Sequence, residues 1–403
     1  MIRSQSLGAV AIKKVIIALF LLSFSRTVLC LYSVRDVGFS DIWSSPYQLY
    51  YFVQDDTPEE YISNIKNISH SILPESNVIF KIINIDKDKD APALEHFHFW
   101  GVESLPSAIL VSPYGQSMVL SLSSTQRPFG ESAWLAIEGV ISSPVRTEML
   151  KHLVEHYAVI VLIEGSDPGQ NERAREEIHA ASDEIKRLMP QMVKSIDGPP
   201  HTIVLSEESV AREKVLLWSL GVDKQEMGDT YVAVLYGRGR RFGPTMKGDK
   251  ITRRNIFNLL YIIGLSCECG LDRQQLLGVM VPLGWGPEIQ SEVVRRLGFD
   301  AESPAVKLEM RQILSSGSGR DIWGGSTARL ASGSFEEYDE VVLELAKMPG
   351  GSTMSPAQLS RLAGYGQTPG SAFSITLVIL EIVALIVILG GIIVLWRARM
   401  RAT

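Results

Sequence analysis

Cysteine is scarce in this chain of 403 residues, and its scarcity limits the chemistry open to the protein. The sequence holds three cysteines and no Cys-x-x-Cys motif, which excludes the usual dithiol site of disulfide exchange. Cys30 falls in an N-terminal segment described below, whereas Cys267 and Cys269 form a Cys-Glu-Cys sequence after an apolar helical stretch. Two close thiols pair readily in an oxidising compartment, and a strained disulfide is easily reduced. Cys267 and Cys269 are therefore candidate catalytic residues of a thiol-disulfide oxidoreductase or isomerase, with a structural disulfide or a packed, reduced pair as the alternative.

An excess of positive charge is also missing. The formal net charge is −6, whereas nucleic-acid-binding proteins carry a basic footprint, so we expect no nucleic-acid partner. The one basic cluster, formed by Arg238, Arg240 and Arg241, lies among glycines at an expected hairpin tip. This setting favours a solvated turn over an anion-binding site. The sequence has no phosphate-binding loop, nucleophile elbow or dinucleotide fingerprint, and we expect no cofactor.

The two ends of the chain carry membrane-targeting patterns. Lys13 and Lys14 precede a ten-residue run at 15–24 that is apolar except for Ser23, which predicts a signal peptide over residues 1–30. Residues 373–396 form a nearly continuous apolar stretch that is long enough to cross a bilayer, and arginines follow it at once. Positive charge marks the cytoplasmic side, so residues 397–403 are an expected cytoplasmic tail. The sequence therefore predicts a single-pass membrane protein of type I topology, with the bulk of the chain extracytoplasmic.

Glu381 lies inside the expected transmembrane helix. A carboxyl group at this depth costs about 2.5–3.5 kcal/mol on insertion scales and is usually functional or paired. Gly390 and Gly391 offer a surface on which a second helix can pack closely. We hypothesise that Glu381 contacts a polar group of a partner membrane protein; a neutral, protonated Glu381 or self-association of the helix are the alternatives.

The pattern of residues 78–115 indicates an α/β unit. An apolar strand ends at Asp86, a charged turn and a short helical stretch follow, and Pro106 directly precedes a second strand at 107–111. An earlier strand at 48–53 carries Tyr50, Tyr51 and Phe52, which favour β structure. This order resembles the thioredoxin superfamily, in which a cis proline precedes the corresponding strand. The resemblance implies that Pro106 is cis.

The strand at 48–53 leads into a turn without a thiol. In the thioredoxin superfamily a Cys-x-x-Cys pair follows this strand, but here the sequence is Gln-Asp-Asp-Thr-Pro over residues 54–58. Asp56 or Thr57 is an expected helix N-cap, and Pro58 suits the first helical position. Asp55, Asp56, Thr57 and Pro106 occupy the place of the superfamily's substrate groove, so the resemblance assigns them to a binding site for a protein.

A weaker copy of the pattern follows. A strand at 158–163, a long charged helix at 171–192 and strands at 202–205 and 231–236 repeat the order, again without cysteines, and Thr230 and Tyr231 stand where a proline is expected. We therefore predict an α/β protein with two tandem thioredoxin-like domains, like redox-inactive protein-disulfide-isomerase-like domains. The predicted divisions are a first domain at 31–145, a second at 146–270, a helical region with a Gly/Ser-rich insert at 271–346, a flexible tether at 347–372 and the transmembrane helix at 373–396.

Two histidine pairs have spacings that can hold a metal ion. His96 and His98 flank Phe97, and His152 and His156 stand four residues apart on a helical stretch. The second pair lacks the glutamate that follows the first histidine in zinc peptidases. The simpler interpretation is that no metal is bound, and that His96 and His98 lie on a helix whose Phe97 and Phe99 face a core. A metal-handling envelope protein remains an alternative.

Together these patterns predict a non-catalytic, membrane-anchored thioredoxin-like protein. The resemblance implies that such a protein acts as a binding or scaffold module, and we expect it to be accessory to a membrane complex. The expected partner is a protein, contacted through the outer domains and through the transmembrane helix.

Overall fold

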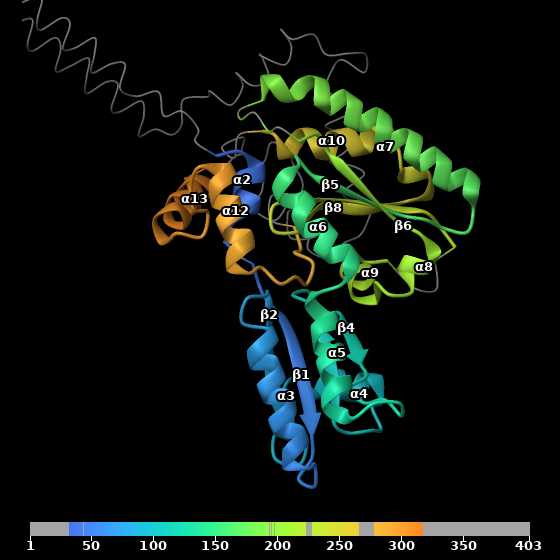
Figure 1. The fold of residues 1–403 in the computed structure, drawn as a ribbon, viewed down its shortest axis with the longest axis vertical. Helices are drawn as coiled ribbons and strands as arrows, with labels where there is room; N and C mark the ends of the chain where they lie inside the picture. The colour runs from blue at the N-terminus through green and yellow to red at the C-terminus, as the bar shows by residue number, and fades with distance from the viewer. Residues whose placement is uncertain are drawn as a thin grey trace, which may run out of the picture. The chain divides into compact units, whose positions relative to one another are not determined.

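The computed structural model describes residues 32–42, 44–192, 194, 196, 198–222, 228–265 and 278–316. Within these residues the chain forms two four-stranded sheets, and the order of strands is the same in both (Figure 1). The predicted signal peptide, Cys267, Cys269, the tether, residues 373–396 and Glu381 lie outside the described residues. None of the helices in the described ranges has the length and apolar character that crossing a bilayer requires.

The first sheet contains residues of the clearer sequence copy. Its strands are β1 (Tyr47–Val53), β2 (Val78–Asn84), β3 (Ser107–Val111) and β4 (Ser117–Leu120), in the order β2-β1-β3-β4. β1 and β2 are parallel, whereas β3 pairs antiparallel with both β1 and β4. α3 (Glu59–Ile72) joins β1 to β2, α4 (Leu94–Trp100) joins β2 to β3, and α5 (Phe129–Ile141) follows β4.

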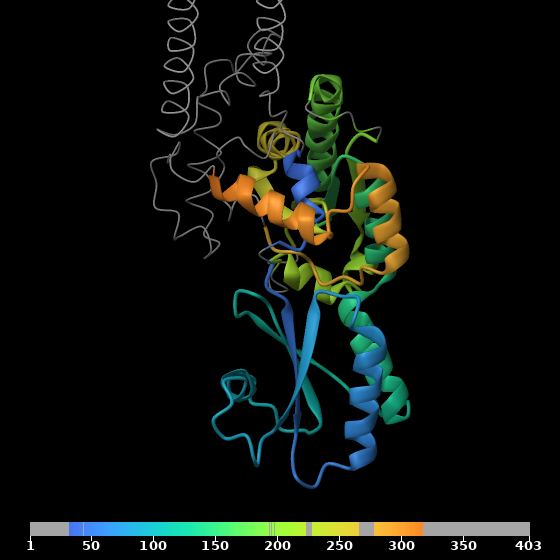
Figure 2. The ribbon, with the colours of Figure 1, turned by 90° about the vertical axis from the view of Figure 1, so that its left-hand side faces the viewer.

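The helices cover both faces of this sheet. In Figure 2, α3 and α5 lie on one face and α4 on the other. On one face, Ile65 of α3 and Ile137 of α5 belong to the same core as Leu49. On the opposite face, Leu94 of α4 packs near Phe52. A sheet with both faces covered explains why β1 is apolar almost throughout.

The second sheet repeats the arrangement. Its strands are β5 (Val159–Ile163), β6 (His201–Leu205), β7 (Tyr231–Tyr236) and β8 (Arg240–Lys247), in the order β6-β5-β7-β8. β5 and β6 are parallel, and the other pairs are antiparallel. The helices are α6 (Pro144–Glu155), α7 (Pro168–Leu188), α8 (Glu207–Val210), α9 (Lys214–Ser219) and α10 (Arg253–Ile263). In both sheets the element order and pairing are those of a thioredoxin-like fold, as the sequence resemblance implied.

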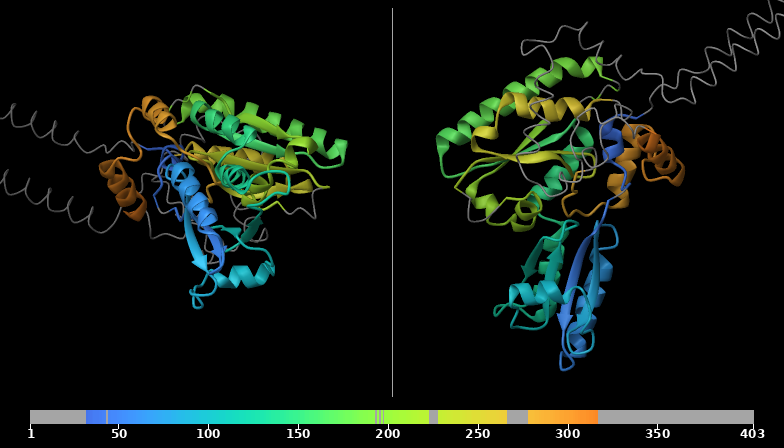
Figure 3. Two further views of the ribbon diagram at one scale, coloured as in Figure 1. Left: turned by 60° about the horizontal axis from the view of Figure 1, so that its bottom comes forward. Right: turned by 180° about the vertical axis from the view of Figure 1, so that it is seen from behind.

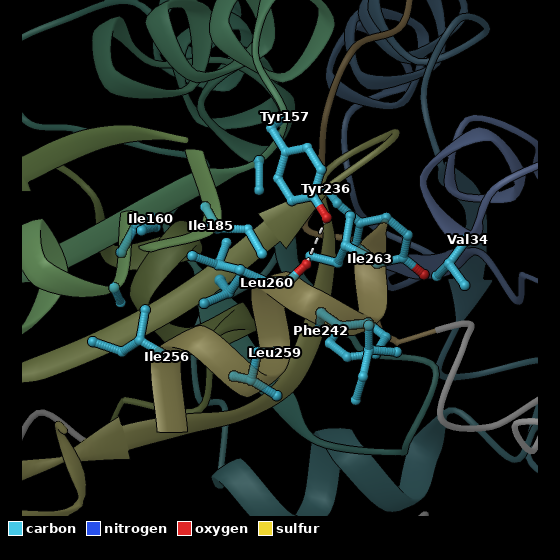
Figure 4. Close-up of a cluster of buried hydrophobic side chains, with 14 of the residues drawn as sticks. Val34, Tyr157, Ile160, Ile185, Tyr236, Phe242, Ile256, Leu259, Leu260 and Ile263 are labelled. Carbon is cyan, nitrogen blue, oxygen red and sulfur yellow. Dashed lines mark hydrogen bonds between the residues drawn. The ribbon is translucent and has the colours of Figure 1, made fainter. Parts of the chain in front are cut away.

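α7 and α10 pack together over one face of the second sheet (Figure 3). Figure 4 shows this core, where the Tyr157 hydroxyl donates a 2.7 Å hydrogen bond to the Leu260 carbonyl, and which includes Ile185 of α7 and Ile256 of α10. Val34 of a short helix, α2 (Val34–Gly38), belongs to the same core. The segment around α2, which the sequence analysis placed in the first domain, thus packs with the second sheet.

Two further helices follow the second sheet. α12 (Pro287–Leu297) and α13 (Pro304–Ser316) both lie within the helical region expected at 271–346. Residues 278–281, which the sequence analysis gave to a helix, instead run beside the start of β8, where Val281 N donates to Gly239 O at 3.0 Å. A short apolar run does not distinguish a strand from a helix. Here the free edge of β8 provides hydrogen-bond partners for the extended form.

The basic cluster is another difference from the expectation. Arg240 is only 1% exposed, and its guanidinium donates to Gly38 O and Ser40 O on the N-terminal segment. Arg241 donates to Leu220 O at 2.8 Å, and Arg238 pairs with Glu302 at 2.7 Å. The hairpin is therefore not a solvated turn, because main-chain carbonyls from distant segments surround it.

Candidate functional site

The candidate site lies at the end of the first sheet where β1 and β2 both terminate. The carboxyl ends of parallel strands meet at one edge of a sheet, and ligands of open α/β sheets bind outside that edge. Two loops leave from it, residues 54–58 after β1 and residues 85–93 after β2. The Leu105–Pro106 peptide bond is cis, as the resemblance implied.

Thr57 closes the loop after β1. Its hydroxyl accepts a 3.0 Å hydrogen bond from Gln54 N, and its own N–H donates to Gln54 O at 3.0 Å. The expected N-cap role of Asp56 or Thr57 is wrong, because Pro58 is the N-cap of α3 and no side chain caps it. The Thr57 oxygen is used within the turn instead, and the side chain is buried there.

Asp55 connects the two loops. Its carboxylate accepts from Lys87 Nζ at 2.6 Å and from Asn84 Nδ2 at 2.9 Å, while Asp55 N donates to Asp86 Oδ2 at 2.9 Å. The hydrogen bond from Lys87, followed by that from Asn84, lowers the pKa of Asp55 below its ordinary value. Asp55 therefore stays ionised, and it holds the loop after β1 against the loop after β2.

The structure brings Pro106 beside β1 but on the other side from Asp55. Phe52 pairs with Ser107 in the register of β1 and β3, so the cis proline lies next to Val53. The partners of Asp55 come from the β2 side of the same strand. Pro106 is half-buried and Asp56 is exposed. The four residues of the expected site thus border the end of β1, with Asp55 already committed to Lys87 and Asn84.

α4 adds aromatic side chains that the sequence analysis placed incorrectly. Phe97 packs on Phe52 with ring centroids 5.0 Å apart, but Phe99 is 78% exposed, so the expected core-facing role of Phe99 is wrong. Residues two apart on a helix point in nearly opposite directions, and only one of them can face the sheet. Trp100 is 45% exposed, and its Nε1 donates to Ser117 Oγ on β4 at 3.0 Å. Helical periodicity, which is readable from the sequence, shows that Phe97 and Phe99 cannot both face the sheet.

The corresponding end of the second sheet is filled by the chain itself. Ser166 N, after β5, donates to Gly228 O at 2.9 Å, and a Cβ on Gly165 would lie 2.4 Å from the same oxygen. Asn171 of α7 hydrogen-bonds both main-chain groups of Gly165 and accepts from the Thr230 hydroxyl at 2.7 Å. Thr230, which stands where a proline was expected, therefore helps to close this end.

The histidine pairs differ in the structure. His96 and His98 lie two residues apart on α4, so they point to different sides of that helix. His152 and His156 lie together at the end of α6, and His201 of β6 joins them. Sequence spacing alone missed His201, which is 45 positions after His156.

Comparisons with known proteins concern the fold. No protein-family model matches the sequence, and the search of curated proteins found no match. Among solved structures, the first two thioredoxin domains of Saccharomyces cerevisiae Eps1p match at 11% identity and a TM-score of 0.19, covering 54% of this chain and 92% of theirs. Human ERp44 in a zinc-bound form matches at 13% identity and a TM-score of 0.20, covering 58% of this chain and 57% of its own. Full-length ERdj5 matches at 8% identity and a TM-score of 0.20, covering 54% and 29%. The thioredoxin-like fold of each sheet unit rests on its strand order, its register and, in the first unit, the cis proline.

Proposed function

We propose that this chain is a membrane-anchored, extracytoplasmic protein whose first thioredoxin-like unit binds a protein partner without redox chemistry. The observation that carries the proposal is the loop after β1. The loop in which the thioredoxin superfamily carries its Cys-x-x-Cys pair contains Asp55 in this chain, and that carboxylate is engaged by Lys87 and Asn84. The loop is built as an ordered acidic surface.

The chemistry of this surface favours a basic segment as the partner. Exposed carboxylates gather there from three short stretches of chain, and they outnumber the two lysines. The acidic residues are Asp55, Asp56, Glu59, Glu60, Asp86, Asp88 and Asp90. Complementary charge raises the association rate and excludes wrongly charged partners more than it raises affinity.

Aromatic side chains on α4 provide an apolar patch on the same sheet unit, and it is tied to Ser117, which pairs with Val111 at the opposite end of β3 from Pro106. Phe99 and Trp100 have ring centroids 5.5 Å apart, and the hydrogen bond to Ser117 holds Trp100 in place. Exposed aromatic groups contribute a large share of the binding energy in protein interfaces. The second unit has no comparable opening among its described residues, because Gly228 covers the loop after β5.

Charge reversal tests the proposal. Full-length protein carrying Asp55→Lys and Asp56→Lys would be purified from its native membrane in mild detergent, and the co-purifying proteins would be quantified against wild type. The matched control is Glu207→Lys with Glu208→Lys, two adjacent exposed acids at the start of α8. We expect a stoichiometric partner that is lost in the first variant and retained in the control. Equal recovery in both variants would place the binding surface elsewhere.

The proposal includes an anchor over residues 373–396 and a contact made by Glu381 within it. A carboxyl group in the apolar part of a membrane favours a polar partner. Glu381→Leu should release a membrane partner or change the oligomeric state in detergent, whereas Leu380→Ala beside it should do neither. An unchanged partner and oligomeric state in Glu381→Leu would remove the intramembrane contact and leave the outer binding surface untouched.

A further inference from the structure

Three histidines from two elements meet at the edge of the second sheet. His152 is in the last turn of α6, His156 is the C-cap of that helix, and His201 is the first residue of β6. One ring nitrogen from each lies within 4.8 Å of one from each of the others. The rings of His152 and His201 stack with centroids 3.6 Å apart, and His156 lies 5.1 Å and 5.0 Å from them.

The main chain holds these three positions. His156 N donates to His152 O at 2.9 Å, and His201 N donates to Ala158 O at 2.9 Å where β6 pairs with β5. From the other side, the buried guanidinium of Arg35 donates to the carbonyls of His156 and Tyr157. The cluster is therefore built on a capped helix end and a paired strand, which is the rigid support that a ligand site needs.

Two of the three rings have hydrogen-bond settings like those of metal-bound histidines. His156 Nδ1 lies 2.9 Å from Pro199 O, to which it donates its hydrogen, so the lone pair is on Nε2. His152 Nδ1 is buried and makes no hydrogen bond, while its other nitrogen lies 3.9 Å from the Glu148 carboxylate. Metal-bound histidines donate their second ring nitrogen to a carbonyl or a carboxylate in the same way. A metal ion would satisfy the unpaired nitrogen of His152.

We propose that His152, His156 and His201 bind one zinc ion, with water at the fourth position. Three imidazole nitrogens and an open position are a common zinc donor set. Nitrogens bound to tetrahedral zinc at about 2.0–2.1 Å lie about 3.3 Å apart. Binding therefore draws the three ligand nitrogens closer together, and the stacked rings of His152 and His201 must turn out of their parallel arrangement. This site is independent of the proposed partner surface, which belongs to the first sheet.

Zinc at this site joins the end of α6 to β6, the edge strand of the second sheet. Without the ion, the backbone of residues 198–201 and side-chain packing make that connection. The ion adds three bonds from the protein at the same place, so it stabilises the folded form by mass action.

Competition with a chromogenic zinc chelator tests the site on tag-free, full-length protein. We expect one zinc per wild-type chain and an affinity on the order of 100-fold lower in His201→Ala, since even outer partners of metal ligands change affinity by about 10–100-fold. The control, His96→Ala with His98→Ala, removes the other sequence-predicted pair and should bind as wild type does. Absence of zinc binding by wild type, or an affinity of His201→Ala within about threefold of it, would overturn the proposal.

A second readout separates loss of ligands from loss of fold. The unfolding temperature of His201→Ala in chelator should match that of metal-free wild type, and added zinc should raise only that of wild type and of the control. His156→Gln is the second variant and should behave as His201→Ala does. Zinc-dependent stabilisation of both ligand variants equal to that of wild type would assign the ion to other residues.

Discussion

The guanidinium of Arg146 lies 3.8 Å from the carboxylate of Glu213, and both side chains are at most 2% exposed. Arg146 is in α6 and Glu213 directly precedes α9, so the pair spans two elements of the second unit. Arg146 also donates to Gly139 O and Ser142 O at the end of α5. Desolvation lowers the pKa of Arg146 to about 10, which still leaves it charged at neutral pH.

Removing this arginine should destabilise the protein strongly. Arg146→Met leaves the carboxylate of Glu213 buried without its cation and several carbonyls without a donor, so we expect a loss of about 3–5 kcal/mol. Glu213→Gln should cost less, because its side-chain oxygen can still accept from Ser143. Urea unfolding of both variants measures the difference. Equal midpoints for Arg146→Met and wild type would show that the pair contributes little.

The link between Asp55 and Lys87 should be visible in a titration. The pKa of Asp55 is lowered in the folded chain, so its contribution to stability is present above the ordinary aspartate pKa and is lost as pH falls through the lower, folded value. Lys87→Met should raise the pKa of Asp55 toward its ordinary value, because the largest cause of the shift is removed. Carbon-13 NMR of labelled aspartates measures this, and Lys81→Met on β2 is the control. An unchanged Asp55 titration in Lys87→Met would argue against the contact.

The closed end of the second sheet depends on the absence of a side chain at Gly165. A Cβ there would lie 2.4 Å from Gly228 O and 2.5 Å from the carbonyl carbon of Asp229, so Gly165→Ala must move this backbone. We expect a loss of about 1–3 kcal/mol, as for other overpacked sites. Gly139→Ala in α5 meets no atom within 4 Å and should be neutral or stabilising by up to about 1 kcal/mol. Thermal unfolding compares the two, and equal effects would contradict the close approach.

Neighbouring aromatic residues on α4 should respond differently to truncation. Phe97→Ala removes a ring that packs on Phe52 and should cost about 3 kcal/mol. Phe99→Ala should change stability by less than about 0.5 kcal/mol, because its ring is exposed. If the α4 surface binds the partner, Phe99→Ala lowers partner recovery without lowering stability. A large stability loss in Phe99→Ala would instead indicate that the Phe99 ring packs in the core.

Local patterns accounted for the elements that surround the candidate site. Alternation of apolar strands with helices predicted both α/β units, and the resemblance to the thioredoxin superfamily implied the cis bond before Pro106. The predicted N-cap of α3 was wrong. The Thr57 hydroxyl can accept a hydrogen bond either from the helix or from the turn before it, and local sequence does not choose between these two roles. The prediction that the basic hairpin is a solvated turn was wrong for another reason. Arg240 is buried by the segment around Gly38, which is about 200 positions earlier in the chain.

By itself the sequence determined the succession of strands and helices along the chain, the cysteine-free turn and the apolar patterns of the two ends, because these follow from residue type and from periods of two and 3.6 residues. The tertiary structure decided which distant groups meet. It placed Lys87 on Asp55, closed the second unit with Gly228 and brought His201 to His152 and His156. The parallel pairing of β5 with β6 brings His201 to the end of α6, and no spacing within one element encodes that contact.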